Sequence, residues 1–380
     1  MVIPFNKPYL TGNEEKYVID AIKSLKHCGN HQYCKKVIDL MKNNHNLGEI
    51  FLVPSGTAAL EMGALLADLQ VGDEVILPSY TFSSTANAIV LRGAIPVFCE
   101  VDPETMNIDV TKVEALITAK TKMIVPIDYA GIPCEIDKVM EIAKKYKLIV
   151  MHDTAQSYGS YYKGKATGAW ADLATYSFHE TKNITCGEGG ALVVNRPEWI
   201  ERAHFLQEKG TDRRLVLNGV KSKYHWVDYG SSFLLSDILA AHLYAQVEKE
   251  DDIFEKRAQV TKMYFDIFTK YQEQGLIQIP EITKDMKINH HAFWVIFNTV
   301  AEKEKFIDSL REQGVYAYIG YMPLHSAPMG KSFGYEPEDL PITEDVASRL
   351  VRMPFWGGIS KSEIAHLKDI IINTMERNIK

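Results

Sequence analysis

Cysteine is scarce in this sequence, and the few that occur follow a pattern that excludes two kinds of structural site. The 380 residues contain five cysteines, which are scattered and form no CxxC pair. An odd, scattered set fits neither a disulfide framework nor a zinc site, so we expect reduced thiols, no bound metal and a cytoplasmic protein. The five are Cys28, Cys34, Cys99, Cys134 and Cys186.

Long apolar runs and basic clusters are missing as well. No stretch reaches the roughly 18 consecutive apolar residues of a membrane-spanning helix, and the N-terminus lacks the apolar core of a signal peptide. The formal net charge is -7. Without clustered Lys and Arg, this charge argues against general nucleic-acid binding. Hydrophobic residues at 46% and charged residues at 24% are typical of a soluble globular protein.

What the sequence does have is an alternation of short apolar runs and amphipathic stretches between residues 49 and 195. The runs are too short for helices and rich in Val and Ile, as expected for buried strands of a largely parallel sheet. Helix-like segments such as Thr57–Leu69, Ser84–Leu91 and Ile136–Tyr146 separate them. The pattern predicts an α/β sheet covered on both faces. The predicted strands are Ile50–Pro54, Val75–Pro78, Pro96–Val101, Met123–Ile127, Leu148–Met151, Leu173–Phe178 and Ala191–Val194.

The pattern changes near residue 247, where a charged helical stretch begins. A strand, a helix, a second strand and a closing helix follow, which indicates a smaller α+β domain. We therefore predict a large domain over residues 1–247 and a small C-terminal domain over residues 248–380. The later elements are Ala292–Phe297, Glu302–Gln313, Val315–Ile319 and Ser362–Met375.

Three segments that follow predicted strands have residues suited to chemistry. Ligands of open α/β sheets bind beyond the carboxyl ends of the strands. The small-residue turn at 55–58 precedes a helix, and its amides could bind an anion or simply cap the helix. Asp153 ends a buried strand, where it could pair with a cation or act as another cap. Lys182 lies beside the glycine-rich segment 187–190, and is either an activated amine or an ordinary surface lysine.

These three segments together supply the parts of a pyridoxal phosphate site. The parts are an anion cradle, a carboxylate that could pair with a pyridinium nitrogen, and an amine that could form an imine. Each segment alone leaves its simpler alternative open. Their shared position at strand ends favours the functional interpretation.

A set of motifs spread along the chain is similar to that of one enzyme family. They are Ser-Gly-Thr-Ala-Ala-Leu at 55–60, Gly-Asp-Glu-Val at 72–75, Pro-Ser-Tyr-Thr-Phe at 78–82, Tyr-Ala-Gly-Ile-Pro at 129–133, Asp-Thr-Ala-Gln at 153–156 and Ser-Phe-His-Glu-Thr-Lys-Asn at 177–183. With these motifs the chain resembles the DegT/DnrJ/StrS sugar aminotransferases over essentially its whole length. Segments 105–109, 208–213 and 229–237 are most similar to transaminases that make dTDP-4-amino-4,6-dideoxygalactose or the corresponding dideoxyglucose.

The resemblance implies the type I fold of pyridoxal 5'-phosphate enzymes and a homodimer with active sites at the subunit interface. Lys182 would bind the cofactor covalently and move the substrate proton. Asp153 would pair with the pyridine nitrogen, Gln156 would lie by the phenolic oxygen, and Phe82 would stack on the ring, although an aromatic residue is by default core. Phosphate contacts would come from Gly56, Thr57, Ala58 and Ser177. In many relatives an asparagine of one subunit also reaches the phosphate bound by the other subunit, and Ser232 would take its place here.

Two further positions differ from the family pattern. Asp128 stands where relatives usually have His, and His152 stands where they usually have Glu. We assign neither residue a role from the sequence. For the nucleotide sugar, the resemblance indicates substrate-side residues in three segments, and an arginine suits a diphosphate. Surface salt bridging or packing is the alternative for each. The candidates are Cys28, Gly29, Asn30, Arg213, Tyr321 and His325.

The activity implied is transfer of an amino group from L-glutamate to dTDP-4-keto-6-deoxyglucose for surface polysaccharide such as O-antigen. The product would be a 4-amino-4,6-dideoxyhexose nucleotide of glucose or galactose configuration. Alternatives are a 3-keto-sugar aminotransferase, the dehydratase branch and a non-catalytic regulatory homologue. Lys182 counts against the dehydratase branch, which lacks this lysine, and Lys182 with Asp153 counts against the silent homologue.

Overall fold

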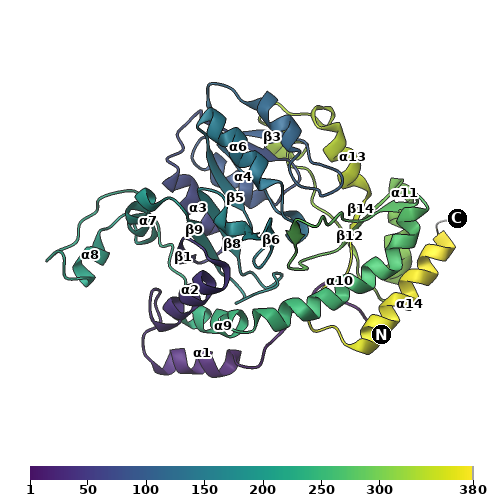
Figure 1. Ribbon diagram of the computed structural model, residues 1–380, viewed down its shortest axis with the longest axis horizontal. Helices are drawn as coiled ribbons and strands as arrows, with labels where there is room; N and C mark the ends of the chain where they lie inside the picture. Colours follow the sequence, from purple (N-terminus) through teal and green to yellow (C-terminus); the bar gives the residue numbers. More distant parts are fainter. Residues whose placement is uncertain (379–380) are drawn as a thin grey trace.

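The computed structural model describes residues 1–378 and is built around a seven-stranded sheet (Figure 1). The strands are β1 (Glu49–Val53), β2 (Glu74–Pro78), β3 (Ile95–Cys99), β4 (Thr121–Ile124), β5 (Ile149–Asp153), β8 (Leu173–Ser177) and β9 (Gly190–Val194). Their order is β1-β9-β8-β5-β4-β2-β3, and only β9 runs against the others. Each strand overlaps one predicted apolar run, so the mostly parallel α/β sheet is confirmed.

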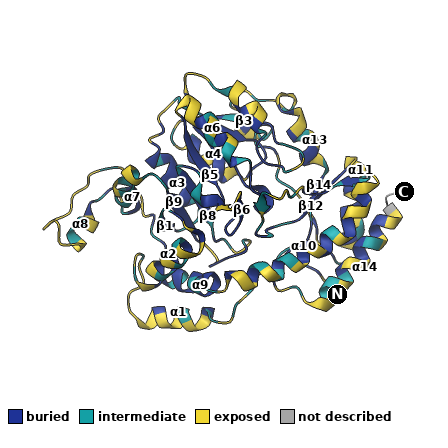
Figure 2. Ribbon diagram, viewed as in Figure 1, coloured by how far each residue is buried: buried dark blue, intermediate teal, exposed yellow. Residues whose placement is uncertain are grey.

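Helices cover both faces of this sheet, because successive side chains of a strand point to opposite sides. The helices are α2 (Gln32–His45), α3 (Gly56–Leu66), α4 (Ser83–Val90), α6 (Ile136–Tyr146), α7 (Ile200–Gln207) and α9 (Asp237–Val247). Phe51 and Val53 of β1 pack with α3, α4 and α7, whereas Ile50 and Leu52 pack with α2 and α9. Helix α6 covers the second face at β4 and β5. Figure 2 shows buried strands between helices whose outer sides are exposed.

A second, four-stranded sheet forms the smaller α+β part of the molecule. Its strands are β10 (Ile277–Gln278), β12 (Trp294–Phe297), β13 (Tyr318–Ile319) and β14 (Leu350–Arg352), and its helices are α10 (Glu250–Glu273), α11 (Val300–Glu312) and α14 (Lys361–Asn378). All neighbouring strands are antiparallel, in the order β10-β12-β14-β13. The long helix α10 joins the two parts (Figure 1). The proposed boundary at residue 247 falls at the break between α9 and α10.

Segments from both ends of the chain cross between the two parts. Ile3 belongs to the core of the smaller part, where its amide donates to the Gly314 carbonyl at 2.9 Å. Helix α13 (Pro341–Arg349) instead lies beside the edge of the large sheet, where Glu100 follows β3. The Glu100 carboxylate accepts hydrogen bonds from the amides of Ile342 and Thr343 at 3.0 and 2.8 Å. It thereby satisfies two donors at the first turn of α13, which have no partner within the helix.

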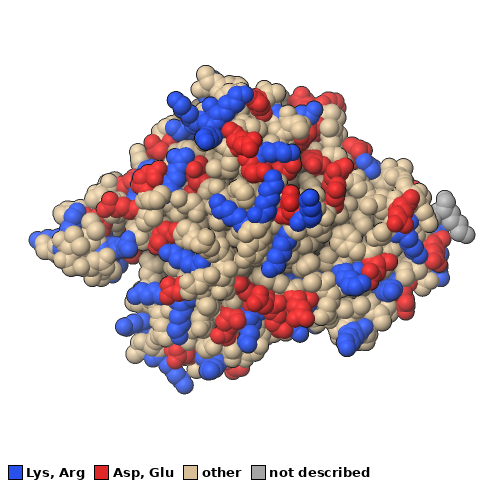
Figure 3. Space-filling model, viewed as in Figure 1, with Lys and Arg blue, Asp and Glu red and all other residues tan. Residues whose placement is uncertain are grey.

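The remaining elements are short or lie at the periphery. They are α1 (Glu14–Lys23), α5 (Val110–Val113), α8 (Arg213–Leu217), α12 (Pro328–Lys331), β6 (Tyr161–Tyr162), β7 (Lys165–Ala166) and β11 (Met286–Lys287). Within residues 1–378, no helix combines the length and apolar character that crossing a bilayer requires. Figure 3 shows acidic and basic side chains interspersed over the face in view.

We expect Glu100→Gln to loosen the attachment of α13 to the large sheet. Hydrogen bonds to a charged acceptor contribute about 1.5–3 kcal/mol, and the amide keeps only part of this, so unfolding free energy should fall by about 1–2 kcal/mol. Urea unfolding of the apoprotein measures the change, with the exposed Glu15→Gln as control. A loss no larger than that of the control would contradict the role of Glu100.

Candidate active site

A cavity of about 330 Å³ opens at the carboxyl ends of the parallel strands. The segments that follow β1, β2, β4, β5 and β8 all contribute to its wall, as expected for an open α/β sheet. The structure therefore brings together eight residues predicted from the sequence. They are Gly56, Thr57, Phe82, Asp153, Gln156, Ser177, Lys182 and Tyr321.

Lys182 lies in the turn that leaves β8, and its amide donates to the His179 carbonyl at 2.9 Å. Burial lowers the pKa of its amine from 10.5 to about 8. Asp153 opposes this effect and the Arg352 cation adds to it. The share of the amine that is neutral near neutral pH is therefore far larger than for an ordinary lysine, and the neutral amine is the form that can attack a carbonyl or accept a proton. The alternative of an ordinary surface lysine is wrong.

Asp153 is the last residue of β5, and its carboxylate is held on both oxygens. The Thr85 hydroxyl donates to Oδ2 at 2.8 Å, and the Ala155 amide donates to Oδ1 at 3.1 Å. Burial raises the pKa of this carboxyl, although both hydrogen bonds and the nearby Lys182 act in the opposite direction. A buried carboxylate of this kind is stabilised by a cationic group in the cavity, and a protonated pyridine nitrogen fits that requirement.

The turn at residues 55–58 serves as both a helix cap and an open cradle. Ser55 Oγ accepts from the Ala58 amide at 3.0 Å, as in an ordinary N-cap. The Ala58 amide is therefore used within the turn, whereas the amides of Gly56 and Thr57 are available to a ligand, and the phosphate contact of Ala58 stays a prediction. A Cβ atom on Gly56 would lie 2.8 Å from the Ser177 Cβ, so only glycine allows this close approach. A phosphate fits here, at the positive end of α3.

Phe82 and Gln156 flank the cavity between these groups. Phe82 is 57% exposed and lines the cavity, so the default expectation of a core aromatic is wrong and its ring is free to stack on a ligand. Gln156 Oε1 accepts from the Ala130 amide at 2.7 Å, and Nε2 donates to the Tyr321 hydroxyl at 3.1 Å. Gln156 thus links the cavity floor to a residue near the smaller sheet.

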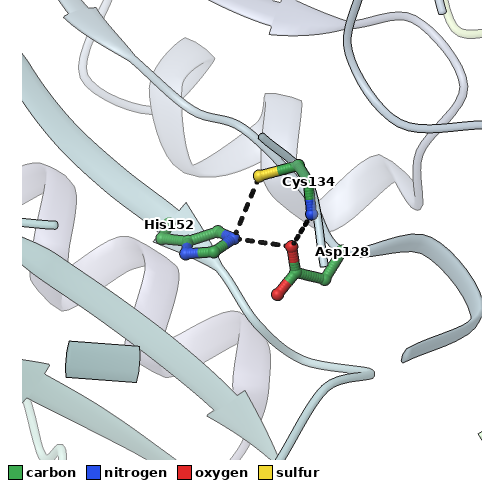
Figure 4. Close-up of side chains that lie close together, drawn as sticks. All are labelled: Asp128, Cys134 and His152. Atoms are coloured by element: carbon green, nitrogen blue, oxygen red, sulfur yellow. Dashed lines mark hydrogen bonds and ion pairs between the residues drawn. The ribbon is translucent and has the colours of Figure 1, made fainter. Parts of the chain in front are cut away.

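Asp128 and His152, to which the sequence assigns no role, face each other (Figure 4). His152 Nε2 lies 2.8 Å from Asp128 Oδ1, and both side chains are fully buried. Asp128 also accepts from the Cys134 amide at 2.8 Å and from the Ser157 hydroxyl at 2.7 Å. Ligand-type atoms of Asp128, Cys134 and His152 lie within 4.8 Å of one another. Because they already bond to each other and their surroundings, we interpret them as a hydrogen-bond network.

Seven predicted residues, among them Ala58, are not part of the lining of this cavity. His325 is fully buried, with Nδ1 2.7 Å from Ser79 Oγ, so its predicted substrate contact is corrected to a core role. The other five lie in three surface segments, and their substrate or phosphate roles stay predictions. Cys28 is exposed, Gly29 packs against the Leu234 side chain and the Leu235 carbonyl, and Asn30 donates to Gln207. Arg213 lies on α8 and Ser232 pairs with Glu208.

Two residues that contact the site have no clear signal in the sequence. For Thr85 the available signal is a hydroxyl residue in the first turn of α4, the helix that follows β2. Arg352 acts on Lys182 through its charge. It lies on β14, a strand of three residues that the apolar pattern does not show.

Comparisons with known proteins agree with the resemblance. The model of the DegT/DnrJ/EryC1/StrS aminotransferase family matches residues 11–372. A GDP-perosamine synthase of Escherichia coli O157:H7 is 30% identical over 97% of both chains. A dTDP-4-dehydro-2,3,6-trideoxy-D-glucose 4-aminotransferase of Saccharopolyspora spinosa is 29% identical over 88% of both. A Streptococcus pneumoniae protein solved in its PLP form shares the fold with a TM-score of 0.91, at 23% identity over the whole of both chains.

The pKa of Lys182 predicts how pH governs cofactor attachment. Because the neutral amine attacks the aldehyde, the rate at which apoprotein binds pyridoxal phosphate covalently should rise with pH, with its midpoint at about pH 8, and level off at higher pH. Stopped-flow absorbance between pH 6 and 10.5 measures it, and Lys182→Ala should give no covalent adduct. A midpoint near the unperturbed 10.5 would contradict the burial argument.

Proposed function

The chain belongs to the DegT/DnrJ/EryC1/StrS aminotransferase family, and we propose that it transfers an amino group from L-glutamate to dTDP-4-keto-6-deoxy-D-glucose. The product is a dTDP-4-amino-4,6-dideoxyhexose for surface polysaccharide. The observation that carries this proposal is the presence of a partly buried lysine and a buried carboxylate in the wall of one cavity, beside a helix N-terminus that fits a phosphate.

The residues of the cavity fit pyridoxal phosphate, the cofactor of this family. Asp153 would hold the pyridine nitrogen, Phe82 the ring face and Gln156 the phenolic oxygen. The amides of Gly56 and Thr57, with the Ser177 hydroxyl, would hold the phosphate. When bound, the cofactor serves as an electron sink that stabilises negative charge at the substrate carbon.

Lys182 performs the proton transfers of the reaction. Its neutral amine takes the proton from the amino-bearing carbon of the donor. Its ammonium form gives a proton to the acceptor carbon that receives the amino group. A pKa of about 8 lets the residue change form readily near neutral pH. The surrounding cavity limits access of water, which protects the reacting carbon from unspecific protonation.

The choice of a 4-keto nucleotide sugar is supported by the names of relatives. One is named for a dTDP-linked 4-keto sugar and another for a GDP-linked amino sugar. The segments 105–109, 208–213 and 229–237 resemble enzymes of the dTDP group. Among the predicted substrate residues, Tyr321 lies at the cavity, where it can contact the sugar.

We also propose that the protein works as a homodimer. The arm at residues 211–230, which carries α8, projects from the molecule (Figure 1). It exposes several large apolar side chains, and an exposed apolar cluster typically marks an interface. Partner contact would bury these groups and bring Arg213 and Ser232 toward a neighbouring cavity. The exposed residues include Leu217, Val220, Tyr224 and Trp226.

Incubation of the holoenzyme with dTDP-4-keto-6-deoxy-D-glucose and L-glutamate tests the reaction. We expect a product with the mass of the amino sugar, and its proton coupling constants distinguish glucose from galactose configuration. Lys182→Ala should lower turnover by at least about 100-fold, because positioned acid–base groups contribute about 10²–10⁴. Turnover of the GDP-linked or a 3-keto sugar alone would show that the class is right and the substrate wrong.

The homodimer is tested by placing a charge on the arm. Trp226, 81% exposed, should be buried at the interface, so Trp226→Asp should shift sedimentation from dimer to monomer. Burying an unpaired carboxylate is strongly unfavourable. Val71→Asp is the matched control, since Val71 is equally exposed but lies outside the arm. A wild-type protein that sediments as a monomer would refute the dimer.

A further inference from the structure

A second, smaller cavity of about 110 Å³ lies on the other side of Lys182. Thr181, Lys182 and Tyr321 line both cavities, so Lys182 stands between them. The additional wall comes from the N-terminal segment and the smaller sheet, including Asn6 and Arg352. None of the cofactor-binding groups described above faces this space except Lys182 itself.

Arg352 is largely buried and has no anionic partner in the described part of the chain. No hydrogen bond or ion pair to its guanidinium is formed within residues 1–378, and its Nε is sealed from solvent without a partner. Its neighbours are aromatic rings, with those of Phe5 and Tyr321 centred 5.0 and 5.9 Å away. A buried charge normally pairs with an opposite charge or a set of hydrogen bonds. Arg352 is therefore a largely buried cation whose guanidinium can still bind an anionic ligand.

Another buried arginine, Arg257, has hydrogen-bond partners for its guanidinium, in contrast to Arg352. Arg257 donates from Nε to the His290 carbonyl at 2.8 Å and from Nη2 to the His291 carbonyl at 2.5 Å. Burial and the nearby cations lower the pKa of His291, so this imidazole is neutral. The charged groups that line the small cavity are therefore both positive, namely Lys182 and Arg352.

We propose that Arg352 binds the α-carboxylate of the amino donor, with Asn6 beside it as a second hydrogen-bond donor. This inference rests on the proposed function in taking an α-amino acid as donor. The amine of the donor must replace Lys182 at the cofactor, so its carboxylate, one carbon away, lies next to Lys182. A guanidinium and a carboxylate pair through two parallel hydrogen bonds.

The size of the cavity favours a carboxylate over the diphosphate of the nucleotide sugar. A water molecule takes about 30 Å³ of liquid volume, so 110 Å³ accommodates a carboxylate with its α-carbon but not a nucleotide. The two substrates thus share the position at Lys182 while the donor alone uses Arg352.

The donor half-reaction measured without any sugar tests this assignment. Stopped-flow changes in cofactor absorbance give the second-order rate constant for reaction with L-glutamate. Arg352→Gln should lower it at least about 30-fold, since truncating one partner of a buried charge pair costs at least about 2 kcal/mol. Arg352→Lys should recover part of the loss, because the charge remains without the bidentate geometry. The second half-reaction, from amine-loaded enzyme and keto sugar, should change less than about threefold.

A shortened donor isolates the carboxylate itself. 4-Aminobutyrate lacks the α-carboxylate of glutamate, so Arg352→Gln should lower reactivity with glutamate far more than with 4-aminobutyrate. Arg349→Gln is the matched control, because Arg349 pairs with Asp345 away from both cavities. Binding of 2-oxoglutarate to amine-loaded enzyme, followed by absorbance, gives an affinity independent of turnover and should weaken in parallel.

The outcomes separate this inference from the proposed function. An equal loss with both donors, or a loss confined to the sugar half-reaction, would overturn the role of Arg352. If L-glutamate gives no absorbance change, the proposed donor is wrong, and the same variants are compared with the common α-amino acid that does react. If the proposed nucleotide sugar is not a substrate, the donor half-reaction, which is measured without sugar, still tests the role of Arg352.

Discussion

The site depends on one electrostatic constraint: charged groups are withdrawn from water at the carboxyl end of the sheet and must be neutralised by one another or by ligands. Asp153 and Lys182 line the same cavity, and each shifts the pKa of the other toward the charged form. Burial acts against both charges, and Arg352 adds a second cation near the lysine. The carboxylate and the two cations therefore compensate each other only in part, which favours binding of a pyridinium and an anion.

The architecture fixes these groups by tying distant segments to the strand ends. Asp153 is held through Thr85, which lies on the helix after β2. The Asp128 amide donates to the Asp153 carbonyl at 3.2 Å, so the loop after β4 supports the end of β5. Arg352 reaches the same region from the smaller sheet. Each charge thus comes from a separate element, and their mutual position is set by the packing of the two parts of the chain.

The sequence predicts those features that local pattern determines. Seven strands are visible because each is a buried apolar run. Asp153 and Lys182 become candidates because they follow such runs, and the family resemblance assigns their roles. Strand β14 is missed because three residues ending in arginine show no periodicity, and the importance of Arg352 arises from burial between segments far apart in sequence. His325 is misplaced for the same reason: its partner Ser79 lies 246 positions away. Phe82 is exposed because a turn, and not a strand, positions its ring.

The buried pair behind the cavity floor joins the loop after β4 to strand β5. His152 Nε2 lies 2.8 Å from Asp128 Oδ1, and Asp128 also accepts hydrogen bonds from the Cys134 amide and the Ser157 hydroxyl. These groups are buried, so removal of either side chain would leave its partner as an unsatisfied buried polar group next to Asp153. Because Asp128 and His152 share one network, the effects of substitutions at the two positions are coupled and do not simply add.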